Sequence, residues 1–71
     1  MTLQSKILDE MIINSKLNHK ELYLLGCKFW ISKEYTEYPN NHLGIQIIKT
    51  NILNEDFIYL CTEENFILKH L

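Results

Sequence analysis

Apolar residues near the start of the chain recur with the spacing of a helix. In residues 3–16 they fall at positions i, i+4, i+5, i+8 and i+9, which lie along one side of a helix, while charged residues fall between them. The stripe consists of Leu3, Ile7, Leu8, Met11 and Ile12. Thr2 precedes it and can cap the first turn. The pattern therefore predicts a first helix over residues 3–16.

A second, shorter helix is predicted over residues 19–25. Asn18 and Glu21 stand three positions apart, which is the spacing of a capping box, in which each side chain accepts a hydrogen bond from the backbone of the other residue. Gly26 follows, and glycine readily adopts the left-handed conformation that ends many helices. This helix therefore has a defined start and stop.

Beyond the second helix the period changes to that of a β-strand. In residues 27–38, apolar residues occupy every second position of the first half. The stretch Pro-Asn-Asn-His at 39–42 has the composition of a turn, and the alternation resumes over residues 43–50. We therefore expect these two strands to form an antiparallel hairpin.

Two further strands are predicted near the end of the chain. Polar turn residues precede residues 57–61, and a third turn at 62–65 leaves 66–70 as another strand. A helix over residues 62–71, capped by Thr62, is the alternative for the last segment, although its apolar residues make a poor helical stripe.

These elements predict a single domain of the α+β class over residues 1–71. It consists of two N-terminal helices followed by a four-stranded antiparallel meander. A chain of 71 residues lies near the lower size limit for one hydrophobic core, so we expect no second domain within it.

The predicted helices are too short to cover both faces of such a sheet. Hydrophobic residues make up 46% of the chain, so a second face would still hold large apolar side chains, among them Trp30 and Ile48. We therefore expect this face to bind a second copy of the chain, giving a homodimer, or another protein. The alternative is that the sheet curls over its own face or that a C-terminal helix covers it.

An acidic rim with tyrosines is expected beside this face. In a meander, the turns at 39–42 and 62–65 share one end of the sheet, which brings carboxylates near tyrosines, and such a rim can steer and anchor a basic partner. Solvated hairpin ends explain the same residues without any function. The residues expected to contact the partner are Trp30, Tyr35, Tyr38, Ile48, Ile58, Leu60, Glu37, Glu63 and Glu64.

A small DNA-binding transcriptional regulator is the alternative function. Residues 16–33 have the pattern of a helix-turn-helix entry, and residues 1–33 carry five lysines against three acidic residues, whereas residues 34–71 carry two against six. The chain has no arginine, which is the residue that most often reads guanine, so base readout lacks its usual donor. The expected nucleic-acid contacts are Lys16, His19, Lys20, Lys28 and Lys33.

No cluster of residues in the sequence predicts catalysis, a metal ion or a cofactor. The histidines His19, His42 and His70 lie in different segments without the spacing of metal ligands, and neither glycine belongs to a phosphate-binding loop motif. An enzyme would require Cys27 or Cys61 to meet a histidine in the fold. A chain this short also has little room for a substrate pocket. We therefore expect a non-enzymatic protein without a small-molecule substrate.

The cysteines and the apolar segments predict the compartment. Cys27 and Cys61 form no metal-binding or redox motif, so free thiols are expected, with a disulfide as the alternative if the protein is exported. No apolar segment is long enough for a membrane-spanning helix, and the N-terminus carries charges where a signal peptide is apolar. We expect a cytoplasmic protein without a membrane partner.

The function expected from these observations is that of a small protein-interaction module, such as an inhibitor, an adaptor or a regulatory accessory protein. The chain is rich in Ile, Lys and Asn and contains neither Ala nor Arg, which fits an AT-rich source such as a mobile element.

Overall fold

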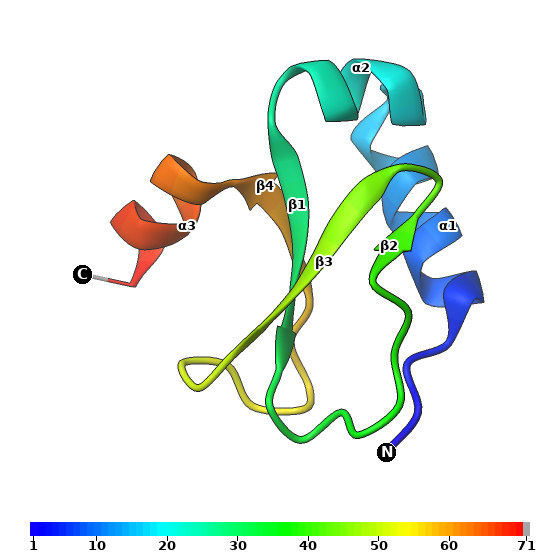
Figure 1. The fold of residues 1–71 in the computed structure, drawn as a ribbon. Coiled ribbons are helices and arrows are strands. Elements are labelled where there is room, and N and C mark those ends of the chain that lie inside the picture. The colour runs from blue at the N-terminus through cyan, green and yellow to red at the C-terminus, as the bar shows by residue number, and fades with distance from the viewer. Residues whose placement is uncertain (71) are drawn as a thin grey trace.

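The computed structural model describes residues 1–70 and shows, within them, a mixed α+β fold with three helices and a four-stranded sheet (Figure 1). In chain order the elements are α1 (Ser5–Ser15), α2 (His19–Leu24), β1 (Cys27–Ser32), β2 (Asn41–His42), β3 (Ile45–Thr50), β4 (Tyr59–Thr62) and α3 (Glu63–Lys69). The strand order is β2-β3-β1-β4, so β1 has a neighbour on each side. The α+β class is confirmed, but the arrangement of its elements differs from the prediction.

The strand β1 runs parallel to β3 and antiparallel to β4. Phe29 lies opposite Ile47 in the parallel pair and opposite Leu60 in the antiparallel pair. The predicted antiparallel meander was therefore wrong, because the chain does not reverse directly after β1. Residues 33–40 carry it to the far edge of the sheet, where β2 pairs antiparallel with β3. Period-two alternation identifies a strand but does not specify its neighbour.

The N-terminal residues hold this crossover segment in place. Thr2 and Glu37 form an isolated parallel bridge, and the N–H of Leu3 donates to the carbonyl of Glu37 at 2.9 Å. The hydroxyl of Thr2 donates to the carboxylate of Glu37 at 2.7 Å. The prediction that Thr2 caps α1 was therefore wrong; the N-cap residue is Gln4, whose side chain makes no capping bond.

The helix α2 confirms the predicted capping box. The N–H of Glu21 donates to Oδ1 of Asn18 at 2.8 Å, and the N–H of Asn18 donates to Oε1 of Glu21 at 3.3 Å. Gly26 follows the helix with a φ of 81°, a left-handed conformation that glycine adopts without a steric penalty. The chain therefore leaves α2 and enters β1 directly.

The strands β2 and β3 are joined by a two-residue turn, Leu43 and Gly44. Both residues have positive φ, 53° and 86°, as a type I′ turn requires. The turn predicted at 39–42 was misplaced, since residues 41–42 form β2. For a residue other than glycine the left-handed conformation costs about 1 to 2 kcal/mol, so Leu43 carries backbone strain.

The helices α1 and α2 cover one face of the sheet, and α3 lies on the other side (Figure 1). Leu8, Ile12 and Leu22 are the helical residues buried against the first face. The sheet contributes Phe29, Ile31, Ile45 and Ile47. They occupy alternate positions of β1 and β3, as side chains that share one face of a sheet do. Each large apolar side chain stabilises the fold by about 1.5 to 3 kcal/mol when fully buried.

The helix α3 forms a second core on the opposite face. Phe66 is buried and stacks on Trp30, with ring centroids 4.3 Å apart and ring planes inclined by 7°. Leu53 completes this cluster. The indole N–H of Trp30 donates to the carbonyl of Cys61 at 3.0 Å, so the polar end of the ring is also satisfied.

The predicted turn at 62–65 and the strand at 66–70 were therefore wrong, and the alternative helix is present over Glu63–Lys69. Leu71, the last residue of that predicted helix, lies outside the described residues. Thr62 caps it by accepting a hydrogen bond from the N–H of Asn65 at 3.3 Å. Acidic residues in the first turn and Lys69 in the last turn also favour a helix electrostatically. The poor apolar stripe is tolerated because the seven-residue helix buries only one side chain.

Replacing Phe66 by alanine should remove most of the second core. We expect the free energy of unfolding to fall by about 3 to 5 kcal/mol, because a buried aromatic ring is deleted and Trp30 loses its stacking partner. Denaturant titration followed by circular dichroism measures this loss. The fluorescence of Trp30, the single tryptophan of the chain, should shift to longer wavelength as its ring becomes exposed.

Ile67→Ala is the matched control because Ile67 lies on the same helix and is more than half exposed. It should cost less than about 1 kcal/mol. Equal losses for Phe66→Ala and Ile67→Ala would contradict the orientation of α3.

Relieving the strain in the β2–β3 turn should stabilise the protein. Leu43→Asn introduces a residue that tolerates positive φ and precedes glycine in the preferred type I′ pair, so we expect a gain of about 1 kcal/mol. Thermal unfolding should then shift upward by about 4 to 8 °C. Leu43→Ala removes the apolar side chain without relieving the strain and should give no gain; a similar gain for both variants would refute the strain argument.

Candidate interaction surface

The structure buries two of the aromatic residues that were predicted to contact a partner. Trp30 lies under α3 and Tyr35 lies in the first core, and each is only 6% exposed. The hydroxyl of Tyr35 donates to the carbonyl of Glu55 at 3.3 Å. The expectation that the second face lacks its own cover was wrong at Trp30, because a helix and not a strand follows Thr62.

The other apolar and aromatic residues that were predicted to contact a partner do not form one surface. Ile48 is half-buried beside the second core, whereas Ile58 and Leu60 pack against the first core on the opposite face. Tyr38 is exposed, and the ammonium of Lys49 lies 5.5 Å from the centroid of its ring.

The predicted acidic rim is not assembled. Glu63 and Glu64 begin α3 beside the start of β1, because Thr62 pairs with Cys27. Glu37 instead follows the end of β1. The rim depended on the meander, and the parallel pairing of β1 with β3 separates its members.

Residues 16–33 do not form a helix-turn-helix. The strand β1 follows α2 where a recognition helix would stand, and it lies inside the sheet. The basic residues predicted to contact DNA are divided among three places. Lys16 lies in the α1–α2 connection, His19 and Lys20 lie in the first turn of α2, and Lys28 and Lys33 lie at the two ends of β1.

The three histidines lie in separate parts of the fold. Nε2 of His42 lies 2.6 Å from Oδ1 of Asp9 and links β2 to α1. Nδ1 of His70 lies 2.9 Å from the carbonyl oxygen of Phe66, and His19 begins α2. Within residues 1–70, no three His, Cys, Asp or Glu side chains gather where they could hold a metal ion.

Cys27 and Cys61 are free thiols that lie on opposite faces of the sheet. Cys27 packs against the first core and Cys61 against the second, although their strands are neighbours. Burial raises the pKa of both thiols. For Cys61 the ammonium of Lys69 lowers the pKa again in part, and Cys27 adds a small further increase. A disulfide between them would require one strand to turn over.

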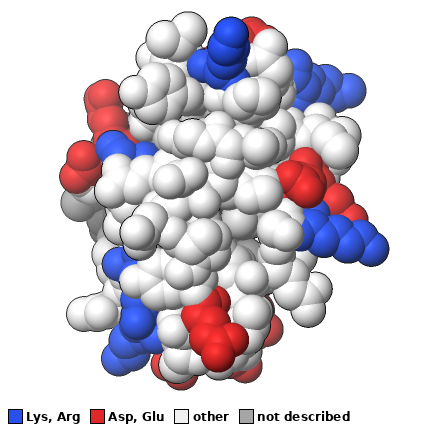
Figure 2. Space-filling view, turned by 45° about the vertical axis from the view of Figure 1, so that its right-hand side comes forward, with Lys and Arg blue, Asp and Glu red and all other residues white. Residues whose placement is uncertain are grey.

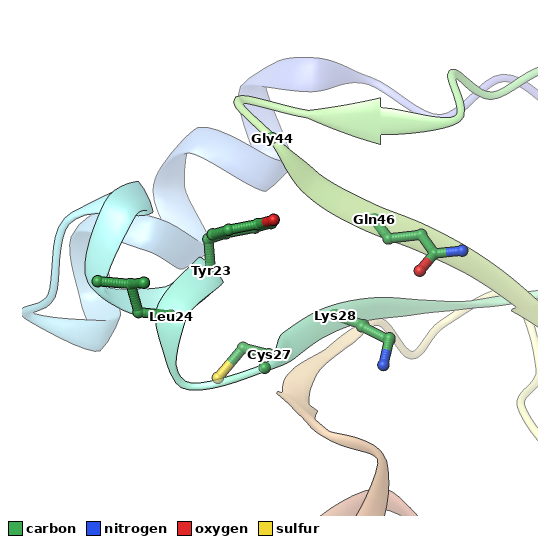
Figure 3. Close-up of a pocket in the computed structure, with 7 residues that line it drawn as sticks. Tyr23, Leu24, Cys27, Lys28, Gly44 and Gln46 are labelled. Carbon is green, nitrogen blue, oxygen red and sulfur yellow. The ribbon is translucent and has the colours of Figure 1, made fainter.

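Two large apolar side chains at the end of α2 face solvent. Leu24 is 81% exposed and Tyr23 is 63% exposed. They line a shallow groove of about 330 Å³ between α2 and β3, toward which the ring of Tyr23 extends (Figure 3). The other lining residues, which together with these two define the α2 groove, are Gly26, Cys27, Lys28, Gly44 and Gln46.

The local sequence explains why the α2 groove is open. Leu22 is the buried residue of α2, and successive helical residues point about 100° apart, so Tyr23 and Leu24 point away from the core. Gly26 and Gly44 both have positive φ, and a Cβ atom at either position would meet nothing within 4 Å. The backbone at both glycines is therefore accessible to a bound segment.

Lys28 supplies the only charge among the residues that line the α2 groove. The register that pairs Phe29 with Ile47 places Lys28 beside Gln46, and both side chains point to the same side of the sheet (Figure 3). The ammonium of Lys28 and the amide of Gln46 thus line the same groove as the ring of Tyr23 and the side chain of Leu24. Such a groove can hold an apolar side chain and pair with a neighbouring carboxylate.

A second apolar surface lies on the outer face of α3. Ile67 and Leu68 are more than half exposed there. Together with Glu63 and Glu64 they line a shallow depression of about 360 Å³. This surface, the outer α3 face, differs from the α2 groove in its charge, because carboxylates replace the ammonium.

Charged residues frame an uncharged area on one side of the molecule. Figure 2 brings the side with α1 and β2 forward; Lys, Asp and Glu lie mainly near its margins, and its centre is uncharged. An uncharged centre with a polar rim is the usual anatomy of a protein-binding surface. In the part of the chain that the structure describes, no helix is long and apolar enough to cross a membrane.

Sequence reasoning missed the α2 groove, although one signal was present. The run Leu-Tyr-Leu-Leu at 22–25 is wider than the single face that a helix of six residues can bury. Gly44 and Gln46 gave no such signal, because their closeness to α2 depends on the parallel pairing of β1 and β3.

Both thiols should react slowly with iodoacetamide at neutral pH. Burial raises their pKa, so the reactive thiolate is a smaller fraction in the folded chain than in the unfolded chain until the pH rises above the folded pKa. Alkylation rates against pH, followed by mass spectrometry, should show a higher midpoint for the folded protein than for the protein in urea. Cys27→Ser and Cys61→Ser assign the two midpoints; identical midpoints in both states would contradict the burial of the thiols.

Comparison of the chain with protein-family models, with curated proteins and with solved structures finds no match. The α2 groove and the outer α3 face are therefore the features from which a function is inferred.

Proposed function

We propose that this protein is a small, non-enzymatic protein-interaction module and that the α2 groove is its docking surface. The exposure of Tyr23 and Leu24 beside a groove with a single cation is the observation that carries this proposal. A module of this kind acts as an inhibitor, an adaptor or a regulatory accessory protein of its partner.

The amount of exposed apolar surface supports docking. Tyr23 and Leu24, with Leu25 and Leu43 next to the two groove glycines, are each more than half exposed. Large apolar side chains gathered around one groove form the kind of exposed patch that marks a protein-contact surface. In a domain this small such a patch lowers solubility, so a binding role gives it a physical reason.

The strain at Leu43 supports the same conclusion. A leucine with a φ of 53° destabilises the turn, and its exposed side chain gains little burial in return. Residues held in strained backbone conformations are concentrated at functional sites. Leu43 stands next to Gly44 of the groove, where it can contact a docked partner.

The chemistry of the α2 groove defines the partner. Tyr23 and Leu24 require an apolar side chain opposite them, and Lys28 requires a carboxylate. The partner is therefore a protein segment in which apolar residues stand beside acidic residues. The free thiols of Cys27 and Cys61 fit a reducing compartment, and we place the module in the cytoplasm.

Site-specific photocrosslinking tests this proposal. A photoreactive phenylalanine analogue at position 24 should capture a partner in an extract of the source cells, and the captured protein is then purified and titrated by calorimetry against the wild-type chain. We expect saturable binding that Leu24→Asp weakens at least about tenfold, or about 1.4 kcal/mol, because a charge enters the apolar contact.

Ile13 provides the matched control. It is 72% exposed on α1, away from the groove, so Ile13→Asp should leave the affinity unchanged. Binding that is insensitive to Leu24→Asp, or equally sensitive to both variants, would refute the α2 groove as the docking surface.

A further inference from the structure

We propose that the partner of the α2 groove is the outer α3 face of a second copy of this chain. This inference rests on the proposed function and names the occupant of the groove. The two surfaces come from one sequence and complement each other in charge and in apolar character.

The charges of the two surfaces are opposite. Lys28 is the only charged residue of the α2 groove, whereas Glu63 and Glu64 are the charged residues of the outer α3 face. An ammonium opposite two carboxylates favours association and fixes the relative orientation of the two copies. The segment Glu-Glu-Asn-Phe-Ile-Leu therefore has the composition that the groove requires, with acidic residues beside apolar ones.

The apolar side chains also match. Leu24 is 81% exposed and can enter the apolar depression of the outer α3 face on the other copy. Ile67 and Leu68 in turn can cover Tyr23 and enter the groove. Each surface thus offers both a projecting side chain and a hollow of similar size, about 330 and 360 Å³.

Twofold symmetry makes the contact large enough for a dimer. A single contact between the two surfaces buries roughly 600 to 800 Å², which is the size of a weak crystal-packing contact. In a twofold dimer the groove of each copy receives α3 of the other, so the contact forms twice. The total then reaches about 1,200 to 1,600 Å², the range of a standard protein interface. The structure therefore supports a homodimer built from two reciprocal contacts.

A mixing experiment tests this arrangement with the full chain. Sedimentation velocity is recorded from about 10 μM to about 1 mM, the range over which weak interfaces associate. Wild-type protein should approach twice the mass of the 8.5 kDa chain, and Leu24→Asp alone and Leu68→Asp alone should remain monomeric. An equimolar mixture of the two variants should fall short of the wild-type mass, because a mixed pair restores only one of the two contacts and brings the two substituted surfaces together in the other. Circular dichroism confirms that each variant is folded.

A control variant and added salt accompany the mixing experiment. Ile13→Asp should dimerise like the wild type, and added salt should weaken the dimer because Lys28 pairs with carboxylates. Wild-type protein that stays monomeric at about 1 mM, a single variant that still dimerises, or a mixture that associates as strongly as the wild type would overturn the inference. A monomeric chain that binds a different, crosslinked partner through Leu24 would overturn this inference while leaving the proposed function intact.

Discussion

The central strand β1 presents large side chains to both faces of the sheet. Phe29 and Ile31 face α1 and α2, while Trp30 faces α3. A chain of 71 residues gains most of its stability from burying such groups, so neither face can be left in water. The helices α1 and α2 cover its first face, α3 covers its second face, and β3 and β4 pair with its two edges. With only Phe66 buried, α3 is a minimal cover for the second face.

The same constraint explains why apolar residues remain outside. The helices α2 and α3 have six and seven residues, and each buries one side chain against the sheet. Leucines elsewhere on such short helices cannot reach a core, so Leu24 and Leu68 stay exposed. The exposed apolar surface thus follows from covering a two-faced strand with short helices. A folded chain of this kind carries surface that a protein contact can use.

Local signals in the sequence predicted local structure. The capping box of Asn18 and Glu21 depends on residues three apart, and the left-handed Gly26 depends on one residue, so both were readable. The alternation along β1 predicted that Phe29 and Ile31 share one face of the sheet. The parallel pairing of β1 with β3 was not readable, because alternation is the same for either direction. The acidic rim failed with the meander, and the α2 groove was missed because Gly44 meets α2 only through that pairing.

The hydrogen bond from Trp30 to Cys61 joins residues 31 positions apart, and this separation bears on biosynthesis. The ribosome makes β1 well before β4 and α3. For part of translation, the indole of Trp30 in the nascent chain is therefore not covered by α3. Transiently exposed apolar strands are the species that aggregate and that chaperones recognise. The second face of β1 is therefore the part of the emerging chain that is open to aggregation and to chaperones until Phe66 packs over it.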